Sequence, residues 1–258
     1  MRQERWIITG QGRLFATSWG YDQEAEMRRA PVVLFHDSLG CVELWRDFPK
    51  RLSQATGRGV IAYDRLGCGR SDAREGELNI DFIREEARTF QVLREQLGFD
   101  SFVAFGHSVG GGMAVVCAGT FPTQCRALVT ESAQAFVEDR TIKGILDAEQ
   151  AFAAEGTLNR LRRYHGDKAA WVLRAWIDTW LSPAFADWTL DDDLRRVRCP
   201  LLAIHGENDE YGSNRHPERI GALTSGPAVL RILADCGHIP HREKENVVLD
   251  AVGAFLDA

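Results

Sequence analysis

The chain has 258 residues, of which 45% are hydrophobic and 26% are charged, and its formal net charge is −6 at pH 7. A chain of this length and composition is typical of one globular α/β domain with a full hydrophobic core. Its acidic balance leaves no basic footprint for phosphate groups, so we expect no nucleic-acid partner.

Local patterns in the first half of the chain predict alternating strands and helices. Residues 5–9 and 13–19 are rich in β-forming side chains and are joined by a glycine-containing turn, which indicates a hairpin. Four continuous apolar runs predict buried parallel strands, at 32–35, 59–63, 102–105 and 126–130. Helical patterns lie between these runs, at 43–55, 79–97 and 111–118. The alternation predicts a mostly parallel sheet with helices on both of its faces.

The alternation stops between residues 136 and 198, where the patterns are helical only. Four of the seven tryptophans fall in this segment, at positions 171, 176, 180 and 188. Strand patterns then resume at 201–204 and 229–233, and an amphipathic helix at 246–256 closes the chain. A helical insertion between two strands must lie outside the sheet. We therefore expect residues 136–198 to form a cap over the strand ends, and 1–135 with 199–258 to form an α/β core.

The stretch Gly106-His107-Ser108-Val109-Gly110 carries the strongest chemical signal. It follows a predicted strand and precedes a predicted helix, which puts Ser108 at the tip of a sharp strand-to-helix turn. Gly106 and Gly110 fit such a turn because a Cβ atom at either position would collide with neighbouring backbone. The helix would direct unpaired N–H groups and a partial positive charge at Ser108. Taken alone, the pattern is also compatible with a simple glycine-rich turn.

A serine hydroxyl needs an adjacent base, and that base needs a third group to orient it. His238 directly follows the last predicted strand, and His241, three residues later, is the reserve candidate. Asp209 follows the preceding strand, while Glu131, just past another strand, is a second possible acid. Ser108, Asp209 and His238 all follow strands, and sites in open parallel sheets form outside the carboxyl ends of the strands. The sequence thus predicts a Ser-His-Asp triad.

Four short motifs occur in a fixed order, at 64–71, 106–110, 206–209 and 237–238. Together with the chain order Ser, Asp, His, they resemble α/β-hydrolase-fold enzymes with a helical cap, over nearly the whole chain. The resemblance implies an oxyanion hole made by the backbone N–H groups of Val109 and, by position, Ser38. The chain departs from the family pattern at Asp37, where glycine is usual, and a carboxylate there would weaken the hole. A serine at 108 argues against haloalkane dehalogenases and epoxide hydrolases, whose resemblance would imply an aspartate.

These observations predict a serine hydrolase that cleaves a small, largely apolar ester through an acyl-enzyme, as carboxylesterases do, without a metal or another cofactor. Leu39, Trp176 and Trp180 are candidate walls of its substrate pocket. A thioesterase, a carbon–carbon bond hydrolase, which Ser38 would favour, and a non-catalytic ligand receptor on the same scaffold are the alternatives. We expect the protein to act as a monomer or homodimer on a small-molecule substrate.

The first residues contain no apolar run long enough for a signal peptide or a membrane span, which favours a cytoplasmic protein without a membrane partner. The six cysteines show no Cys-x-x-Cys pair and no zinc-finger spacing to histidine. We therefore expect reduced thiols, mostly as small core residues.

Overall fold

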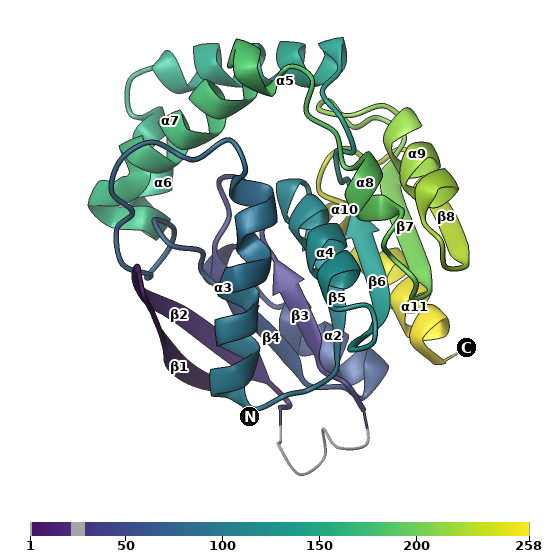
Figure 1. Cartoon of the computed structure of the whole chain (residues 1–258). Helices are drawn as coiled ribbons and strands as arrows, with labels where there is room; N and C mark the ends of the chain where they lie inside the picture. The colour runs from purple at the N-terminus through teal and green to yellow at the C-terminus, as the bar shows by residue number, and fades with distance from the viewer. Residues whose placement is uncertain (1, 22–28, 258) are drawn as a thin grey trace.

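A single mixed sheet organises the fold (Figure 1). The structure is a computed structural model that describes residues 2–21 and 29–257. Within these residues the sheet has eight strands, and their spatial order is β1 (Arg2–Thr9), β2 (Gly12–Trp19), β4 (Val60–Tyr63), β3 (Val32–Phe35), β5 (Phe102–His107), β6 (Cys125–Glu131), β7 (Leu201–Gly206) and β8 (Ala228–Leu233). β1 pairs antiparallel with β2, and β2 with β4, while every later pair is parallel. The predicted hairpin and mostly parallel sheet are confirmed.

Helices cover both faces of this sheet, because its central strands are apolar on both sides. In β3, Val33 and Phe35 face one hydrophobic cluster while Val32 and Leu34 face the other, as the alternation of side chains along a strand requires. The first cluster packs under α3 (Phe82–Leu97), α4 (Val109–Thr120) and α9 (Arg215–Leu223). The second packs under α2 (Phe48–Thr56) and α11 (Glu245–Asp257). The continuous apolar runs of the sequence are thus two-sided core strands.

The segment between β6 and β7 is largely helical and contains α5 (Asp139–Ala153), α6 (Thr157–His165), η2 (Gly166–Lys168), α7 (Ala169–Trp180), η3 (Pro183–Phe185) and α8 (Asp191–Leu194). α5, α6 and α7 contact one another and lie over the edge at which the parallel strands end (Figure 1). α8 instead packs beside the core against α4 and α9. The helical insertion therefore covers the carboxyl ends of the strands with its first three α-helices.

Two polar side chains tie these helices to the core below. His165, at the end of α6, accepts a hydrogen bond from the Gly69 N–H (2.9 Å) and donates one to the Leu39 carbonyl (3.0 Å). The Lys168 ammonium donates to the carbonyls of Gly69 (2.8 Å) and Ser71 (2.6 Å). The loop after β4 is thus bonded directly to the helices above it.

Two predicted helices differ from the structure in their extent. The helix expected at 43–55 is broken into η1 (Val42–Trp45) and α2, because Arg46 between them has φ 53° and cannot continue a helix. The helix expected from residue 79 begins at Phe82, since Asn79 forms a local turn by accepting the Asp81 N–H at 3.0 Å. Hydrophobic periodicity predicts the apolar face of each helix, but it does not indicate where the backbone breaks the helix.

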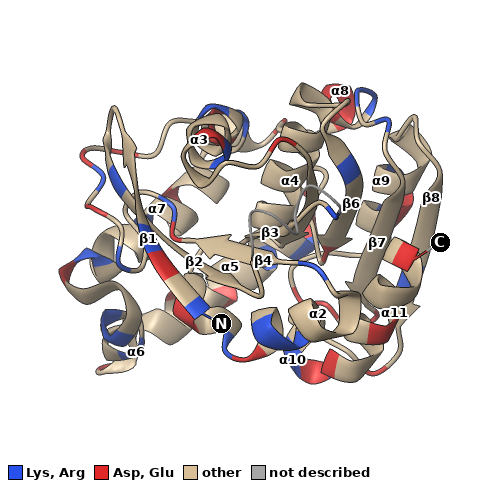
Figure 2. Ribbon diagram, turned by 90° about the horizontal axis from the view of Figure 1, so that it is seen from below, with Lys and Arg blue, Asp and Glu red and all other residues tan. Residues whose placement is uncertain are grey.

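Charged residues of both signs are interspersed along the ribbon in Figure 2, and β1 alone carries blue, red and blue segments. Among the described helices, none combines the length and the apolar character that crossing a membrane requires. All six cysteines are buried free thiols.

Candidate active site

Ser108 stands at a strained turn between β5 and α4. Its backbone angles are φ 55° and ψ −128°, a conformation that residues other than glycine rarely adopt. The Ser108 N–H donates to the Glu131 carbonyl at 2.8 Å, which joins the turn to the end of β6. An ideal Cβ on Gly106 would lie 2.1 Å from the Gly110 carbonyl oxygen, and one on Gly110 would lie 2.1 Å from that of Phe35. The turn therefore requires glycine on both sides of the serine, as the sequence indicates.

His238 and Asp209 are brought together on the loops after β8 and β7. His238 Nδ1 lies 2.9 Å from each carboxylate oxygen of Asp209, and both residues are buried. The carboxylate also accepts the backbone N–H groups of Tyr211 (2.8 Å) and Gly212 (3.2 Å). These bonds fix Asp209, and Asp209 in turn holds the imidazole with Nδ1 protonated and Nε2 free to act as a base.

The loop that carries His238 is fixed by its own neighbours. The His107 Nε2–H donates to the His238 carbonyl at 2.9 Å. Glu243, in α10 (Pro240–Glu243), folds back and accepts the N–H groups of Gly237 (2.6 Å) and Ile239 (3.0 Å). The sequence analysis did not assign these positioning roles to His107 and Glu243, because the bonds depend on how the loop closes.

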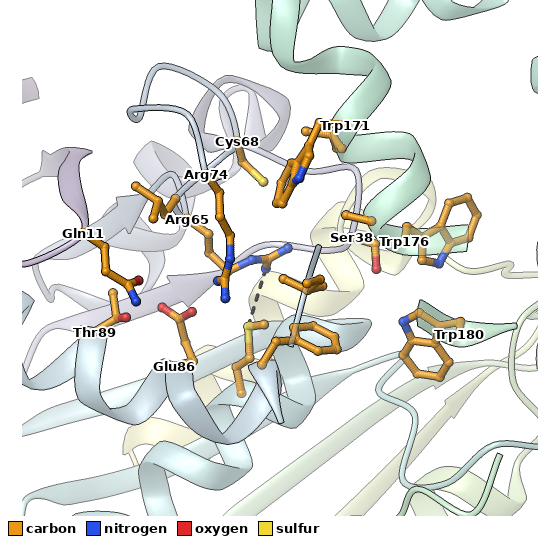
Figure 3. A pocket seen from close by; sticks show the side chains of 16 residues that line it. Gln11, Ser38, Arg65, Cys68, Arg74, Glu86, Thr89, Trp171, Trp176 and Trp180 are labelled. Carbon is orange, nitrogen blue, oxygen red and sulfur yellow. Dashed lines mark hydrogen bonds between the residues drawn. The ribbon is translucent and has the colours of Figure 1, made fainter. Parts of the chain in front are cut away.

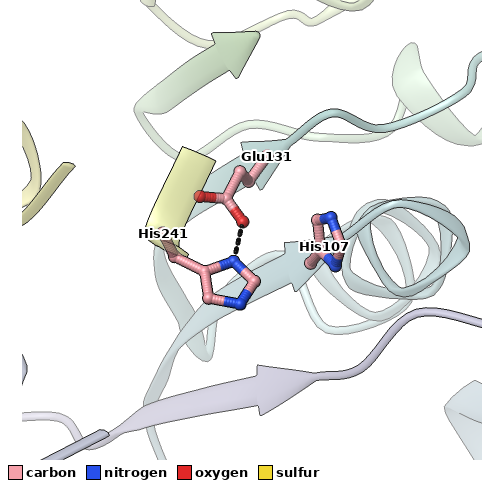
Figure 4. Close-up of side chains that lie close together, drawn as sticks. All are labelled: His107, Glu131 and His241. Carbon is pink, nitrogen blue, oxygen red and sulfur yellow. Dashed lines mark hydrogen bonds and ion pairs between the residues drawn. The ribbon is translucent and has the colours of Figure 1, made fainter. Parts of the chain in front are cut away.

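Glu131, the second possible acid, is bonded to a different histidine. Its carboxylate lies 2.5 Å from His241 Nδ1, and this buried pair joins the end of β6 to α10 (Figure 4). The structure therefore pairs Asp209 with His238 and Glu131 with His241, the reserve candidate. The His107 ring centroid lies 5.0 Å from that of His241 and 5.1 Å from that of His238, so His107 connects the two pairs.

One group of described residues also has the composition of a metal site, and it consists of His107, Glu131 and His241. Their ligand atoms lie within 4.8 Å of one another, and all three residues are buried. A metal ion held there would replace the Glu131–His241 hydrogen bond.

A cavity of about 210 Å³ opens above Ser108 and His238. The sequence-predicted wall residues Leu39, Trp176 and Trp180 line it, with Ser38. Other lining residues come from the loops and from α5, and they are Asp37, His107, Gln134, Thr141, Ile145, Glu210, Tyr211 and Ile239. The structure thus brings every candidate pocket residue to the same space as the candidate nucleophile.

The family described as "alpha/beta hydrolase fold" matches residues 30–177. The chain belongs to this family. The chain is also 29% identical over 229 residues to human "Serine hydrolase BPHL", covering 86% of this chain and 77% of the relative. It is 22% identical over 271 residues to "Proline iminopeptidase" of Lactobacillus helveticus, covering 89% and 90%. A solved structure, a serine hydrolase described as involved in carbazole degradation, superposes with a TM-score of 0.77 at 20% identity over 100% of this chain and 99% of that one.

In this α/β hydrolase the Ser108 hydroxyl contacts the side-chain amide of Gln134. Its side-chain hydrogen bond within the described residues goes to Gln134 Oε1, at 3.4 Å. Gln134 and Tyr211, whose ring centroid lies 4.7 Å from that of His238, are site residues that the sequence analysis missed. Gln134 lies three residues past the end of β6, and Tyr211 lies two residues past Asp209. A search of all loops that follow strands would therefore have found both.

The candidate oxyanion donors of this α/β hydrolase come from two different segments of the chain. Val109 is the first residue of α4, and Ser38 follows β3 in the cavity wall. The Asp37 carboxylate, the departure from the family pattern, lies over Gly40 and 4.0 Å from His107 Nδ1. Burial alone would raise the pKa of the Asp37 carboxyl group, but its interactions with His107, His36 and Arg65 lower it below the ordinary value.

The acid limb of the pH profile is expected to lie above pH 6.5 and to depend on Asp209. Burial alone would lower the pKa of His238, but the charge and hydrogen bond of Asp209 raise it above the ordinary value of 6.5. A base must be unprotonated, so kcat/KM should fall as the pH drops through this raised pKa. Asp209→Asn should move the limb to lower pH and reduce the plateau, as measured with a p-nitrophenyl ester.

The matched control is Glu207→Gln, which removes an exposed carboxylate from the same loop and should leave the limb in place. A limb that did not move in Asp209→Asn would assign the orienting acid to another residue.

Proposed function

We propose that this α/β hydrolase is a serine hydrolase that cleaves a small, largely apolar carboxylic ester through an acyl-enzyme. The observation that supports it most is that Ser108, on a strained turn, shares one cavity with His238, whose Nδ1 is held by Asp209 at 2.9 Å. That arrangement supplies a nucleophile, a base and an orienting acid.

In the proposed reaction, the Ser108 hydroxyl leaves Gln134 by rotation about its Cα–Cβ bond and attacks the acyl carbon. His238 Nε2 takes the hydroxyl proton and delivers it to the leaving alcohol, whose bond to the acyl carbon breaks. The backbone N–H groups of Val109 and Ser38 would bind the oxyanion, each typically contributing about 3 kcal/mol to the transition state. Water, deprotonated by His238, then attacks the acyl carbon. The bond from that carbon to Ser108 Oγ breaks, His238 returns the proton to Oγ, and the carboxylic acid is released.

We further propose that residues 136–198 act as a cap that selects the substrate. Thr141 and Ile145 of α5 and Trp176 and Trp180 of α7 close the cavity above Ser108. The space of about 210 Å³ lies below the range of roughly 300–1,000 Å³ that is usual for ligand pockets, which favours a small substrate.

The same steps would serve a thioester, and the position of Ser38 in the cavity wall favours carbon–carbon bond cleavage as a second candidate. Parallel assays with esters, thioesters and vinylogous diketones of matched size would rank the three by kcat/KM. Ligand binding without turnover of any of them would favour the receptor alternative.

A fluorophosphonate tests the nucleophile without knowledge of the substrate. We expect one phosphonyl adduct per chain, on the peptide that contains Ser108, as measured by mass spectrometry. Labelling should be slowed in His238→Ala, because the hydroxyl is weak without its base. Labelling at another serine, or equal rates in the two proteins, would contradict the proposal.

A further inference from the structure

We propose that the substrate carries a carboxylate at the far end of its acyl group, and that Arg74 binds this carboxylate in a second compartment. The inference rests on the proposed esterase function and names its substrate class, the monoesters of dicarboxylic acids.

The second compartment is a small cavity that adjoins the one above Ser108. Ser38, Trp176 and Trp180 line both cavities. The second has a volume of about 60 Å³, which suits an end group rather than a whole substrate. Trp171 and Trp176 form its aromatic side in Figure 3. Other apolar side chains also line it, among them Leu66, Leu78, Phe82, Met113 and Val172. Its charged and polar side chains are those of Gln11, Ser38, Arg65, Arg74, Glu86 and Thr89.

The guanidinium groups of Arg65 and Arg74 differ in how many of their N–H donors already have partners in the protein. Arg65 donates to the backbone carbonyls of His36 and, at 2.9 Å, Asp37, so its role is to hold the loop after β3. Arg74 is largely buried, and within the described residues its one ion pair is with Glu85 at a long 3.5 Å. Figure 3 shows the Arg74 guanidinium inside the cavity. Arg74 therefore keeps donors available for a ligand.

Glu86, the acidic residue of this compartment, is already engaged. Its carboxyl accepts the Tyr63 hydroxyl at 2.6 Å, and both side chains are buried. Burial raises the pKa of Glu86 above its ordinary value, although the charges of Arg65 and Arg74 act to lower it. Two guanidinium groups, of Arg65 and Arg74, and one carboxyl group line the compartment, so positive charge is in excess there.

The compartment lies on the side of the site that holds the acyl group, because His238 marks the side that holds the leaving group. His238 must deliver its proton to the leaving alcohol, so the leaving group lies against His238, Tyr211 and Ile239. None of these three residues lines the second compartment, which shares the wall residues Ser38, Trp176 and Trp180 with the first. The acyl chain therefore points toward Arg74.

A carboxylate is the end group that this compartment fits best. An alkyl end would remove water from the Arg74 guanidinium without replacing its hydrogen bonds, which is costly. A carboxylate replaces them with charge-assisted bonds to a planar donor pair. An ammonium end would be repelled by both arginines.

The test compares p-nitrophenyl hemiesters of succinic, glutaric, adipic and suberic acid with p-nitrophenyl esters of unsubstituted acids of the same length. We expect kcat/KM to favour the hemiester at one length in the series. In Arg74→Gln this preference should fall by about tenfold or more, while kcat/KM for p-nitrophenyl acetate is retained. Arg74→Lys should restore part of the preference.

Arg88→Gln is the matched control, since it removes the same charge from an exposed position of the neighbouring helix α3. Its preference should equal that of the unmodified protein. A preference that is absent at every length, or equal in Arg74→Gln and the unmodified protein, overturns the inference while leaving the esterase proposal intact.

Binding of the free diacid provides a readout that does not require turnover. Titration of the unmodified protein with adipate should change the fluorescence of the tryptophans that line the compartment, and hexanoate should do so only at much higher concentration. Arg74→Gln should lose this difference. If no ester were hydrolysed but adipate bound in an Arg74-dependent way, the esterase proposal would fail and the carboxylate site would stand. Equal responses to adipate and hexanoate would overturn the site.

Discussion

Ser108→Ala is expected to lower kcat for short p-nitrophenyl esters by roughly 10⁴ to 10⁶, with the fold unchanged. In the proposed mechanism the substitution removes the oxygen that forms the acyl-enzyme, and His238 and Asp209 then have no proton to relay. The loss should fall on kcat, because the cavity walls that bind the ester stay in place. Steady-state rates with p-nitrophenyl acetate and butyrate measure it.

Ser132→Ala is the matched control for this result. Ser132 is likewise buried at the end of a strand with a positive φ of 48°, and its hydroxyl has no hydrogen-bond partner among the described residues. The control should keep its rate, and Ser108→Ala should keep the thermal midpoint of the unmodified protein. Equal turnover by Ser108→Ala and the unmodified protein would remove the basis of the proposed mechanism.

The second large effect concerns stability, and it comes from breaking the Glu131–His241 pair. Glu131 is fully buried at 0% exposure, so His241→Ala would leave a buried carboxylate without its partner. Leaving a buried charge without its partner typically costs about 3–5 kcal/mol of unfolding free energy. For a chain of this size we expect the thermal midpoint to fall by roughly 10 °C. Calorimetry, or urea unfolding followed by fluorescence, measures the change.

Lys143→Ala provides the comparison, because it breaks a Lys143–Asp147 pair whose side chains are 75% and 59% exposed. Exposed pairs contribute less than about 1 kcal/mol, so this variant should unfold like the unmodified protein. The double variant Glu131→Gln with His241→Ala should recover part of the loss, since no charge then remains buried. Equal midpoints for His241→Ala and Lys143→Ala would show that the buried pair contributes little.

The same pair has a defined pH dependence. Burial alone would raise the pKa of Glu131, but the charge and hydrogen bond of His241 lower it below the ordinary value of 4.5. A lowered pKa means that the folded state binds protons less readily than the unfolded state. The contribution of Glu131 is therefore fully present above about pH 4.5 and is lost as the pH falls through the lowered value.

Much of this architecture could be predicted from local sequence. The strands of the core are continuous apolar runs because both of their faces are buried, as in β3, and that pattern needs no knowledge of the neighbours. The nucleophile turn is equally local, since the glycines at 106 and 110 are separated by three residues and the first is required by contact with the second. Order along the chain then placed Ser108, Asp209 and His238 at strand ends.

Only the tertiary structure decided which groups meet at those ends. The sequence favours Asp209 over Glu131 as the triad acid, but each follows a strand, and the path of the loop from His238 to His241 is what gives each acid its own histidine. The Arg74 compartment could likewise not be predicted from the sequence, because its walls come from the first hairpin, α3, α4 and α7. Contacts between distant segments depend on side-chain direction and loop closure, which strand and helix periodicity does not encode.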